Sequence, residues 1–557
     1  MLDNQWKGRI GIMDSITNMD EQPHWVFPDE LYASSRTRGL YSPSRLLVRL
    51  RRDFNELLSS DQLSVPMAHA DPEMLSAFST YFHETIHWWQ HIGSTTGLML
   101  SFAYPAHCHV NRAHLLDVLA AVGPQKSLRR FLEAEYHTIP EETRRQLNII
   151  LNNWHDVEFN RRIILNPLKI REVAESPFFE SVGHSLEIGL GQTLWMLSAT
   201  FDPNFEFMPD IRKWEEGFAD LKRRKVKGFY YGSPISLVPV GALQIFEGQA
   251  RFNQIQYLYL ASGGNLTWSD FEKMGMMSDT YVGAFRHFLD CAELTWPATP
   301  VDPVVQLFLL VCDLAINPSD GYPFDLHHFE SFIVSADPGF RFHLFSRHLA
   351  KNPALKSAIS NCNASEYIEL STILCKSLVC HHPVEIAEHI MKWVAEQESL
   401  KGLLIEDDTF HFQNVNLPVR LCFAKHIRFA SDRISRPEFF CWPAMHFVEN
   451  PVTTPDLDES LALWQRHQPL FLADLEGEIH PVLHQGRDES GIEKTFNNFY
   501  SWNIVYDLVS QWIVSEGPFD LDYTWLTPNY TTEVVGPLAS EKFRESFGVG
   551  LDEFNIR

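Results

Sequence analysis

The sequence predicts a mainly α protein with minor strands (α+β with few strands), and three observations support this fold class. Apolar residues recur at helical spacing over long segments. Prolines interrupt the chain between these segments, and the strand-like runs, near Ser44–Val48 and Val415–Phe423, are short. The predicted helices are Pro72–Ile92, Leu115–Val122, Glu141–Asn153, Pro239–Ala261, Val305–Ile316, Ser365–Cys380, Val384–Gln397 and Phe496–Ser515.

The length and composition indicate a folded chain with several domains. A chain of 557 residues is long enough for two to four domains, and its 45% apolar content is typical of a globular core. The segment Trp296–Pro303 contains three prolines, which break any continuous helix. We therefore expect one domain in residues 1–295 and a helix-rich second domain in residues 296–557, with a weaker break at 451–455.

Charge and cysteine usage restrict the partners and the compartment. The formal net charge of −25 argues against nucleic acid as a partner, because its phosphate backbone would be repelled. This charge also gives no reason to expect an anionic membrane surface as a partner. The longest apolar stretch, Val304–Ile316, is too short to span a bilayer. The N-terminus has no basic head followed by an apolar run, and the eight cysteines lack CxxC spacing. We therefore expect a cytoplasmic protein with free thiols.

The most informative helix is Pro72–Ile92. Asp71 is a suitable N-cap, Pro72 fits the first helical position, and Gly93 suits a C′ position with a left-handed backbone. One face of the helix is broad and apolar, whereas the other carries polar side chains but no Lys or Arg. Because an exposed polar face usually carries basic residues, we expect this face to line a cleft. Its residues are Ser76, Ser79, Thr80, His83, His87 and Gln90.

This helix contains the motif His83-Glu84-Thr85-Ile86-His87. The four-residue spacing places both imidazoles on one face, so that they can hold one metal ion. Zinc binds neutral imidazole nitrogen, and a catalytic site combines three protein ligands with one open position. A zinc-bound water loses its proton near neutral pH, and Glu84 is placed to accept that proton. The alternative is a structural histidine pair without a metal.

Over about twenty residues around this motif, the chain resembles the zincin superfamily of metallopeptidases. The resemblance implies a zincin-like helical metal-binding domain within residues 1–295, with Zn²⁺ as cofactor. It also implies His83 and His87 as ligands, Glu84 as general base, and hydrolysis of peptide bonds. The role of the C-terminal domain stays open.

The third ligand has to come from elsewhere in the chain. The residues after His87 do not match HExxHxxGxxH, and His91 is rotated away from His83. The other large zincin branch, the gluzincins, uses a Glu from a separate helix, and Glu247 is the best match because it lies in an apolar segment. An i,i+4 pair between Glu247 and Arg251 is the alternative, and both roles can coexist. Glu187 and then Glu158 are reserve ligands.

Several polar residues are candidates to stabilise the negative charge of a tetrahedral intermediate. They are Arg251, Tyr231, Tyr230 and His91, with Arg251 and Tyr231 the first choices. Unrestricted proteolysis in the cytoplasm would be harmful. We therefore expect a peptide or protein substrate of narrow range and, as a further partner, a regulatory protein.

Other clusters are weaker. His107, Cys108 and His109 with His114 have metal-binding side chains, but consecutive residues point in different directions. A group near residues 375–382 lacks a standard zinc spacing, and its Pro383 favours the start of a helix. The basic run 222–227 is typical of a solvated helix end, with a docking patch as the alternative. The residues of the second group are Cys375, Cys380, His381 and His382.

Two other functions remain open from the sequence. One is a non-catalytic protein in which a metal holds a binding domain together. The other is a non-haem iron enzyme, because Glu84-Thr85-Ile86-His87 is also a Glu-x-x-His unit of the kind found in helical di-iron sites. Such a site needs a second unit, and Glu21-Gln22-Pro23-His24 has a proline inside the turn.

Overall fold

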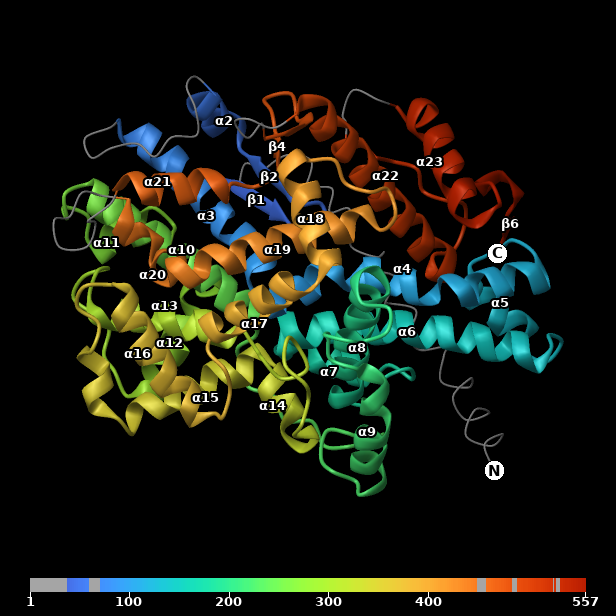
Figure 1. The fold of residues 1–557 in the computed structure, drawn as a ribbon, viewed down its shortest axis with the longest axis horizontal. Helices are drawn as coiled ribbons and strands as arrows, with labels where there is room; N and C mark the ends of the chain where they lie inside the picture. The colour runs from blue at the N-terminus through green and yellow to red at the C-terminus, as the bar shows by residue number, and fades with distance from the viewer. Residues whose placement is uncertain (1–37, 60–70, 448–456, 483–487, 524, 527–530) are drawn as a thin grey trace.

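The computed structural model describes every residue except 1–37, 60–70, 448–456, 483–487, 524 and 527–530 (Figure 1). The described chain is mainly helical with few strands, as the sequence predicts. The helices are α2 (Arg52–Ser59), α3 (Pro72–Gly93), α4 (Thr95–Val122), α5 (Leu128–Glu135), α6 (Glu141–Leu165), α7 (Ile170–Ala174), α8 (Val182–Phe201), α9 (Trp214–Arg223), α10 (Ala242–Ala261), α11 (Trp268–Lys273), α12 (Asp279–Ala292), α13 (Pro303–Ala315), α14 (Phe332–Ala336), α15 (Pro338–Ala350), α16 (Ala364–Ser377), α17 (Pro383–Glu396), α18 (Glu398–Thr409), α19 (Leu417–Ser435), α20 (Pro437–Cys441), α21 (Leu457–Arg466), α22 (Glu489–Val514) and α23 (Thr532–Phe547).

Two small sheets join segments from both ends of the chain. The larger has the order β1-β2-β4-β5, with β1 antiparallel to β2 and β2 parallel to β4. The smaller pairs β3 with β6 in parallel. The predicted halves, 1–295 and 296–557, therefore share sheets as well as a core, and the boundary between them stays a prediction. The strands are β1 (Gly39–Ser42), β2 (Leu47–Leu50), β3 (Gln125–Lys126), β4 (Phe471–Ala473), β5 (Ile479–Pro481) and β6 (Asn555–Ile556).

All eight predicted helices exist, although three were predicted too short, one of them α22, which begins at Glu489 and not at Phe496. The segment predicted at 115–122 is only the end of α4, and the one predicted at 141–153 is only the first half of α6. The predicted strand near Val415–Phe423 is wrong, because Leu417 begins α19 with Pro418 in its first turn. A short apolar run does not distinguish a buried strand from a buried helix.

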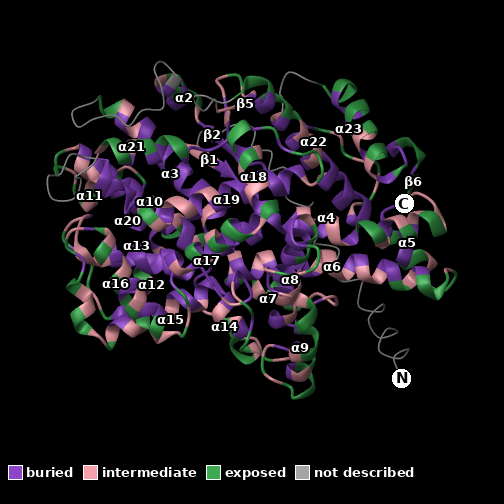
Figure 2. Cartoon of the chain, in the orientation of Figure 1, coloured by how far each residue is buried: buried purple, intermediate pink, exposed green. Residues whose placement is uncertain are grey.

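Helix α3 lies in the interior, where Figure 2 shows mostly buried residues. Almost every side chain from Leu75 to Ile92 is buried, including the polar face. The polar face is therefore enclosed, and the expectation that it lines a cleft is not supported. It lacks Lys and Arg because it packs against α10, where Gln254 donates to Ser79 and Gln90 donates to Gln249.

The end of α3 differs from the prediction as well. Asp71 caps the start as expected, but Gly93 is the last helical residue and does not have a left-handed backbone. A Cβ atom at Gly93 would lie 2.3 Å from the ring of Phe429, so the glycine permits close packing of α19. Ser94 follows and caps α4, accepting a hydrogen bond from the backbone of Gly97.

Two further sequence predictions concern cysteines and membranes. All eight cysteines are unpaired, as predicted. Within the described part of the chain, no helix has the length and apolarity that crossing a membrane requires.

Candidate metal centre

Three side chains from α3 and α10 bring their ligand atoms together. The Nε2 atoms of His83 and His87 lie 3.1 Å apart, one helical turn separating the residues. Glu247 reaches them from α10, with its Oε2 3.4 Å from Nε2 of His83 and 3.6 Å from Nε2 of His87. We call this group the α3–α10 cluster. The structure thus places the predicted third ligand, Glu247, at both imidazoles.

The spacing of these atoms suits one shared ion. Tetrahedral zinc with bonds of about 2.1 Å separates its nitrogen and oxygen ligands by about 3.4 Å. The distances of 3.1 to 3.6 Å within the cluster match this separation. Oε2 of Glu247 is buried and accepts no hydrogen bond from any described residue, which is costly for a carboxylate oxygen. A cation bound between the three atoms would satisfy it.

A chain of hydrogen bonds fixes the orientation of the His87 ring. The Gln90 side-chain amide donates to the Phe246 carbonyl and to Gln249 Oε1, both at 2.9 Å. Gln90 Oε1 therefore faces Nδ1 of His87, 2.8 Å away, and accepts its proton. In a neutral ring, this bond leaves the lone pair of Nε2 directed at His83 and Glu247.

The charges of the cluster are strongly coupled. Burial, together with the positive charge of Arg251, lowers the pKa of His83 to about 3. Burial also acts to lower the pKa of His87, but Glu247 and Glu84 outweigh it and raise that pKa to about 9. The pKa of Glu247 is well below its usual value, because the two imidazoles outweigh its burial. Without an ion, the His87 ring therefore carries an additional proton and is positively charged. A metal that binds to this ring would displace that proton.

Glu84 lies next to the ligands but outside their shared point. It is 5% exposed, and burial raises its pKa to about 7. Strand β1 runs beside it: a Cβ atom at Gly39 would lie 2.7 Å from Glu84 Oε1 and 2.9 Å from Cγ2 of Thr80. Gly39 therefore leaves the space that the carboxylate occupies. A single glycine at the start of a short strand gave no signal of this role in the sequence.

Among the described residues, Glu247 pairs with the two imidazoles and not with Arg251. The alternative interpretation, an i,i+4 salt bridge between Glu247 and Arg251, is therefore wrong. The guanidinium carbon of Arg251 lies 3.7 Å from the ring centroid of Tyr281 on α12, and Arg251 donates to Gln254. The Tyr281 ring in turn meets that of His83 edge-on, at 6.1 Å between centroids. Tyr281 was not predicted, because nothing in the sequence of α12 indicates that its first turn reaches α3.

The structure places the predicted tyrosine, Tyr231, on a loop and not on the helices that carry the α3–α10 cluster. Tyr231 is 60% exposed in the loop that follows α9. Gly228, three residues earlier, packs against Gly183 of α8 and Ile333 of α14. The loop that also holds Tyr230 is therefore anchored at α8 and α14 rather than at α3, so the predicted role of Tyr231 at the reaction centre is not supported.

The remaining candidate ligands have other partners. His91 is buried, and its Nδ1 donates to the His87 carbonyl at 2.8 Å. Glu187 lies 3.9 Å from His184, in a separate cluster with Asp156. Glu158 accepts a hydrogen bond from Tyr104 at 2.7 Å. None of these three belongs to the α3–α10 cluster.

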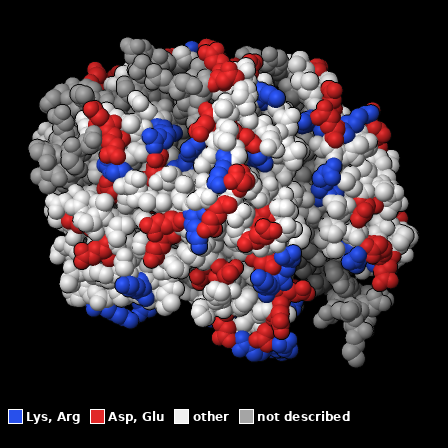
Figure 3. Space-filling model, viewed as in Figure 1, with Lys and Arg blue, Asp and Glu red and all other residues white. Residues whose placement is uncertain are grey.

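Two of the weaker candidate clusters of the sequence form a helix start and surface ion pairs, and none brings three metal ligands together within the described residues. Among the described residues, neither the group around His107 nor the one around Cys375 brings three metal ligands together. His382 caps the start of α17, where its backbone N–H donates to Glu385, as Pro383 indicated. The basic run ends α9 and pairs with acidic groups, for example Lys222 with Glu180. Figure 3 shows basic and acidic side chains intermingled in this part of the surface.

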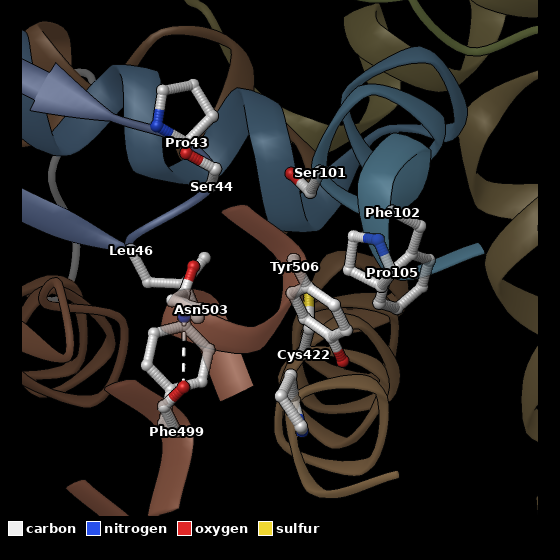
Figure 4. A pocket seen from close by; sticks show the side chains of 11 residues that line it. Pro43, Ser44, Leu46, Ser101, Phe102, Pro105, Cys422, Phe499, Asn503 and Tyr506 are labelled. Carbon is white, nitrogen blue, oxygen red and sulfur yellow. Dashed lines mark hydrogen bonds between the residues drawn. The ribbon is translucent and has the colours of Figure 1, made fainter. Parts of the chain in front are cut away.

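A pocket elsewhere in the molecule is separate from the cluster (Figure 4). It lies between the β1–β2 turn, α4, α19 and α22, and its walls are mostly apolar. Ser101, Pro105 and Tyr506 line it, whereas His83, His87 and Glu247 do not. The pocket therefore does not open onto the candidate metal ligands.

Comparisons with protein-family models, curated proteins and solved structures give no match. The resemblance to zincins thus rests on the motif, and the chain is assigned to no family.

Proposed function

We propose that the protein is a zinc-dependent peptidase that hydrolyses peptide bonds. The observation that carries the proposal is the convergence of His83, His87 and Glu247 on one point, with Glu84 beside it. Two imidazoles and one carboxylate form a donor set that catalytic zinc sites use. Zinc held there would polarise a substrate carbonyl and lower the pKa of a bound water.

The surrounding residues have distinct roles in this proposal. Glu84 accepts the proton of the attacking water and returns it to the leaving amine. Its raised pKa, about 7, suits a group that must both accept and release a proton near neutral pH. Arg251, held against the Tyr281 ring, supplies positive charge close to the imidazoles and stabilises negative charge that develops on the substrate.

Strand β1 supports a peptide as substrate. In the described sheet, β1 pairs only with β2 and forms the edge. An extended peptide can add to such an edge through backbone hydrogen bonds. Because Gly39 of β1 lies against Glu84, a peptide added there would run past the proposed base.

The enclosure of the centre supports a narrow substrate range. His83 and His87 are 5% and 8% exposed, and the Glu247 side chain is 22% exposed. Entry to such a site needs a substrate of limited size or an opening induced by a regulatory protein. The proposed location is the cytoplasm, supported by eight unpaired cysteines, with no role for nucleic acid or membrane.

The test is digestion of a complex peptide mixture by the zinc-loaded full chain, with new termini identified by mass spectrometry. Glu84→Gln should lower the cleavage rate by about 10²- to 10⁴-fold, because it removes the proton acceptor. Its zinc content and melting temperature should stay close to those of the wild type. Glu187→Gln is the matched control, because Glu187 is another carboxyl whose pKa burial raises to about 7, outside the cluster. Cleavage that survives in Glu84→Gln would contradict the proposal.

The burial of the cluster also favours a second candidate, a non-catalytic protein held together by the ion. In that case Glu84→Gln would change the melting temperature, and no cleavage would be found with the wild type. The non-haem iron alternative remains a prediction, and its second Glu-x-x-His unit, Glu21 to His24, lies outside the described residues.

A further inference from the structure

A second group of metal-binding side chains lies between α12 and α15. His287 and Cys291 stand one turn apart on α12, and His343 faces them from α15. Nε2 of His287 lies 3.0 Å from Nδ1 of His343. Sγ of Cys291 lies 3.5 Å from the first of these nitrogens and 3.4 Å from the second. In the described parts of the chain, this α12–α15 cluster is the only such group besides the α3–α10 cluster.

Hydrogen bonds alone do not account for this triangle. Each of its three edges would need one donor and one acceptor. An imidazole nitrogen that carries a proton has no lone pair left in the ring plane, so it cannot donate and accept at once. The triangle has only two hydrogens, one on the proton-bearing nitrogen and one on the thiol, so at most two of its edges can be ordinary two-centre hydrogen bonds. A single cation within the triangle would interact favourably with all three atoms.

The distances agree with those of a metal site. Around tetrahedral zinc, two nitrogen ligands lie about 3.3 Å apart, and a nitrogen and a sulfur ligand about 3.6 Å apart. The cluster has 3.0 Å between the nitrogens, and 3.4 and 3.5 Å from nitrogen to sulfur. We infer that His287, Cys291 and His343 form a second binding site for a zinc-like divalent ion, with two imidazoles and one thiolate as ligands.

The surroundings of the cluster favour neutral imidazole rings. Burial lowers the pKa of both His287 and His343, which favours the form of the ring that binds a metal. Burial raises the pKa of Cys291, although the positive charge of Arg347 opposes this, so a metal ion that binds there has to displace the thiol proton. All three ligands are only half-buried, so an ion can reach them from solvent.

This site would connect two helices rather than carry out a reaction. His287 and Cys291 lie in the second half of α12, and Tyr281 lies in its first turn beside the ring of His83. An ion shared with His343 would hold α12 against α15, and it would thereby help to keep Tyr281 in place. The evidence for this second site is the geometry of its three side chains, so the site does not depend on the proposed peptidase activity.

Cobalt is the probe that separates the two clusters, because only the α12–α15 cluster contains a thiolate. The full chain, stripped of metal with a chelator, is titrated with Co²⁺ and followed by absorption. We expect a near-ultraviolet thiolate-to-cobalt band whose final intensity corresponds to one thiolate-bound cobalt ion per chain, also when the α3–α10 cluster takes up a second ion. Cys291→Ser should lose the band, and His343→Ala should weaken cobalt binding there by more than about 100-fold. Cys380→Ser, which alters another half-buried thiol, should keep the band.

A second measurement needs no variant. Zn²⁺ should slow the alkylation of Cys291 in the wild-type chain, as mapped by mass spectrometry, while leaving the rate at Cys380 unchanged. The inference is overturned if the folded wild type gives no thiolate-to-cobalt band, if Cys291→Ser retains it, or if zinc leaves the alkylation of Cys291 unaffected.

Discussion

The α3–α10 and α12–α15 clusters share one local design but differ in their surroundings. In each, two ligands stand one turn apart on a helix, and a third comes from a neighbouring helix. The α3–α10 ligands are largely enclosed, whereas the α12–α15 ligands are half-buried. The first cluster also has an amide that orients a ligand, Gln90, and an acid beside the ligands, Glu84. In these two proposals, the spacing of the side chains indicates where an ion would bind, and the neighbouring residues decide whether a reaction could follow.

The largest expected difference between the clusters is in activity. His87→Ala should reduce peptide cleavage to background and remove one ion, because it deletes a ligand at the proposed reaction centre. His343→Ala should remove the other ion and leave most of the cleavage. Metal analysis of both purified variants, with rates on the same peptide, provides the measurement. Equal loss of activity in the two variants would mean that the clusters do not have separate roles.

Stepwise metal removal tests the same comparison without mutations. A chelator should strip the half-buried α12–α15 site first, because solvent and chelator reach its ligands directly. Activity should fall only in the second phase, when the enclosed α3–α10 site empties. Metal content and cleavage rate, both followed over time, provide the measurement. If activity is lost while the first ion is removed, the α3–α10 site empties first, which would contradict the expected order.

Gln90→Ala should have a smaller effect, confined to the enclosed cluster. The substitution removes the acceptor that holds Nδ1 of His87 and thereby sets its tautomer. Loss of such a partner lowers metal affinity by about 10- to 100-fold. Competition with a chromophoric chelator measures this change, and cobalt binding at the α12–α15 cluster serves as the internal reference. An unchanged affinity would show that packing alone orients the ring.

The smallest expected effect concerns the space around Glu84. A methyl group introduced by Gly39→Ala would lie 2.7 Å from Glu84 Oε1, so the carboxylate has to move. We expect a loss of activity of roughly tenfold with metal content unchanged, because small displacements of a reacting group are costly. Gly191→Ala is the matched control, since no atom lies within 4 Å of a Cβ at that position. If Gly39→Ala keeps full activity, β1 has no role in positioning Glu84.

The sequence predicted more of the α3–α10 cluster than of anything around it. The four-residue spacing of His83 and His87 places their rings on one helical face, whatever the rest of the chain does. Glu247 stood out because a lone carboxylate in an apolar helix needs a partner, and the structure brings it to both rings. The predicted role of Tyr231 in stabilising the intermediate is not supported, because no local pattern distinguishes a loop tyrosine that reaches the site from one that is exposed.

Other features depend on contacts between distant parts of the chain. His343 follows His287 by fifty-six positions, and no spacing in the sequence relates them until α15 packs on α12. Gly39 and Tyr281 reach the site from a strand and a helix without any motif. The sequence by itself determined most of the helices and the placement of two imidazoles on one helical face, because helical periodicity is local, and it singled out Glu247 as a carboxylate that needs a partner. Only the tertiary structure decided the burial of the polar face, the neighbours of Glu84 and the second cluster, because these depend on how separate helices pack.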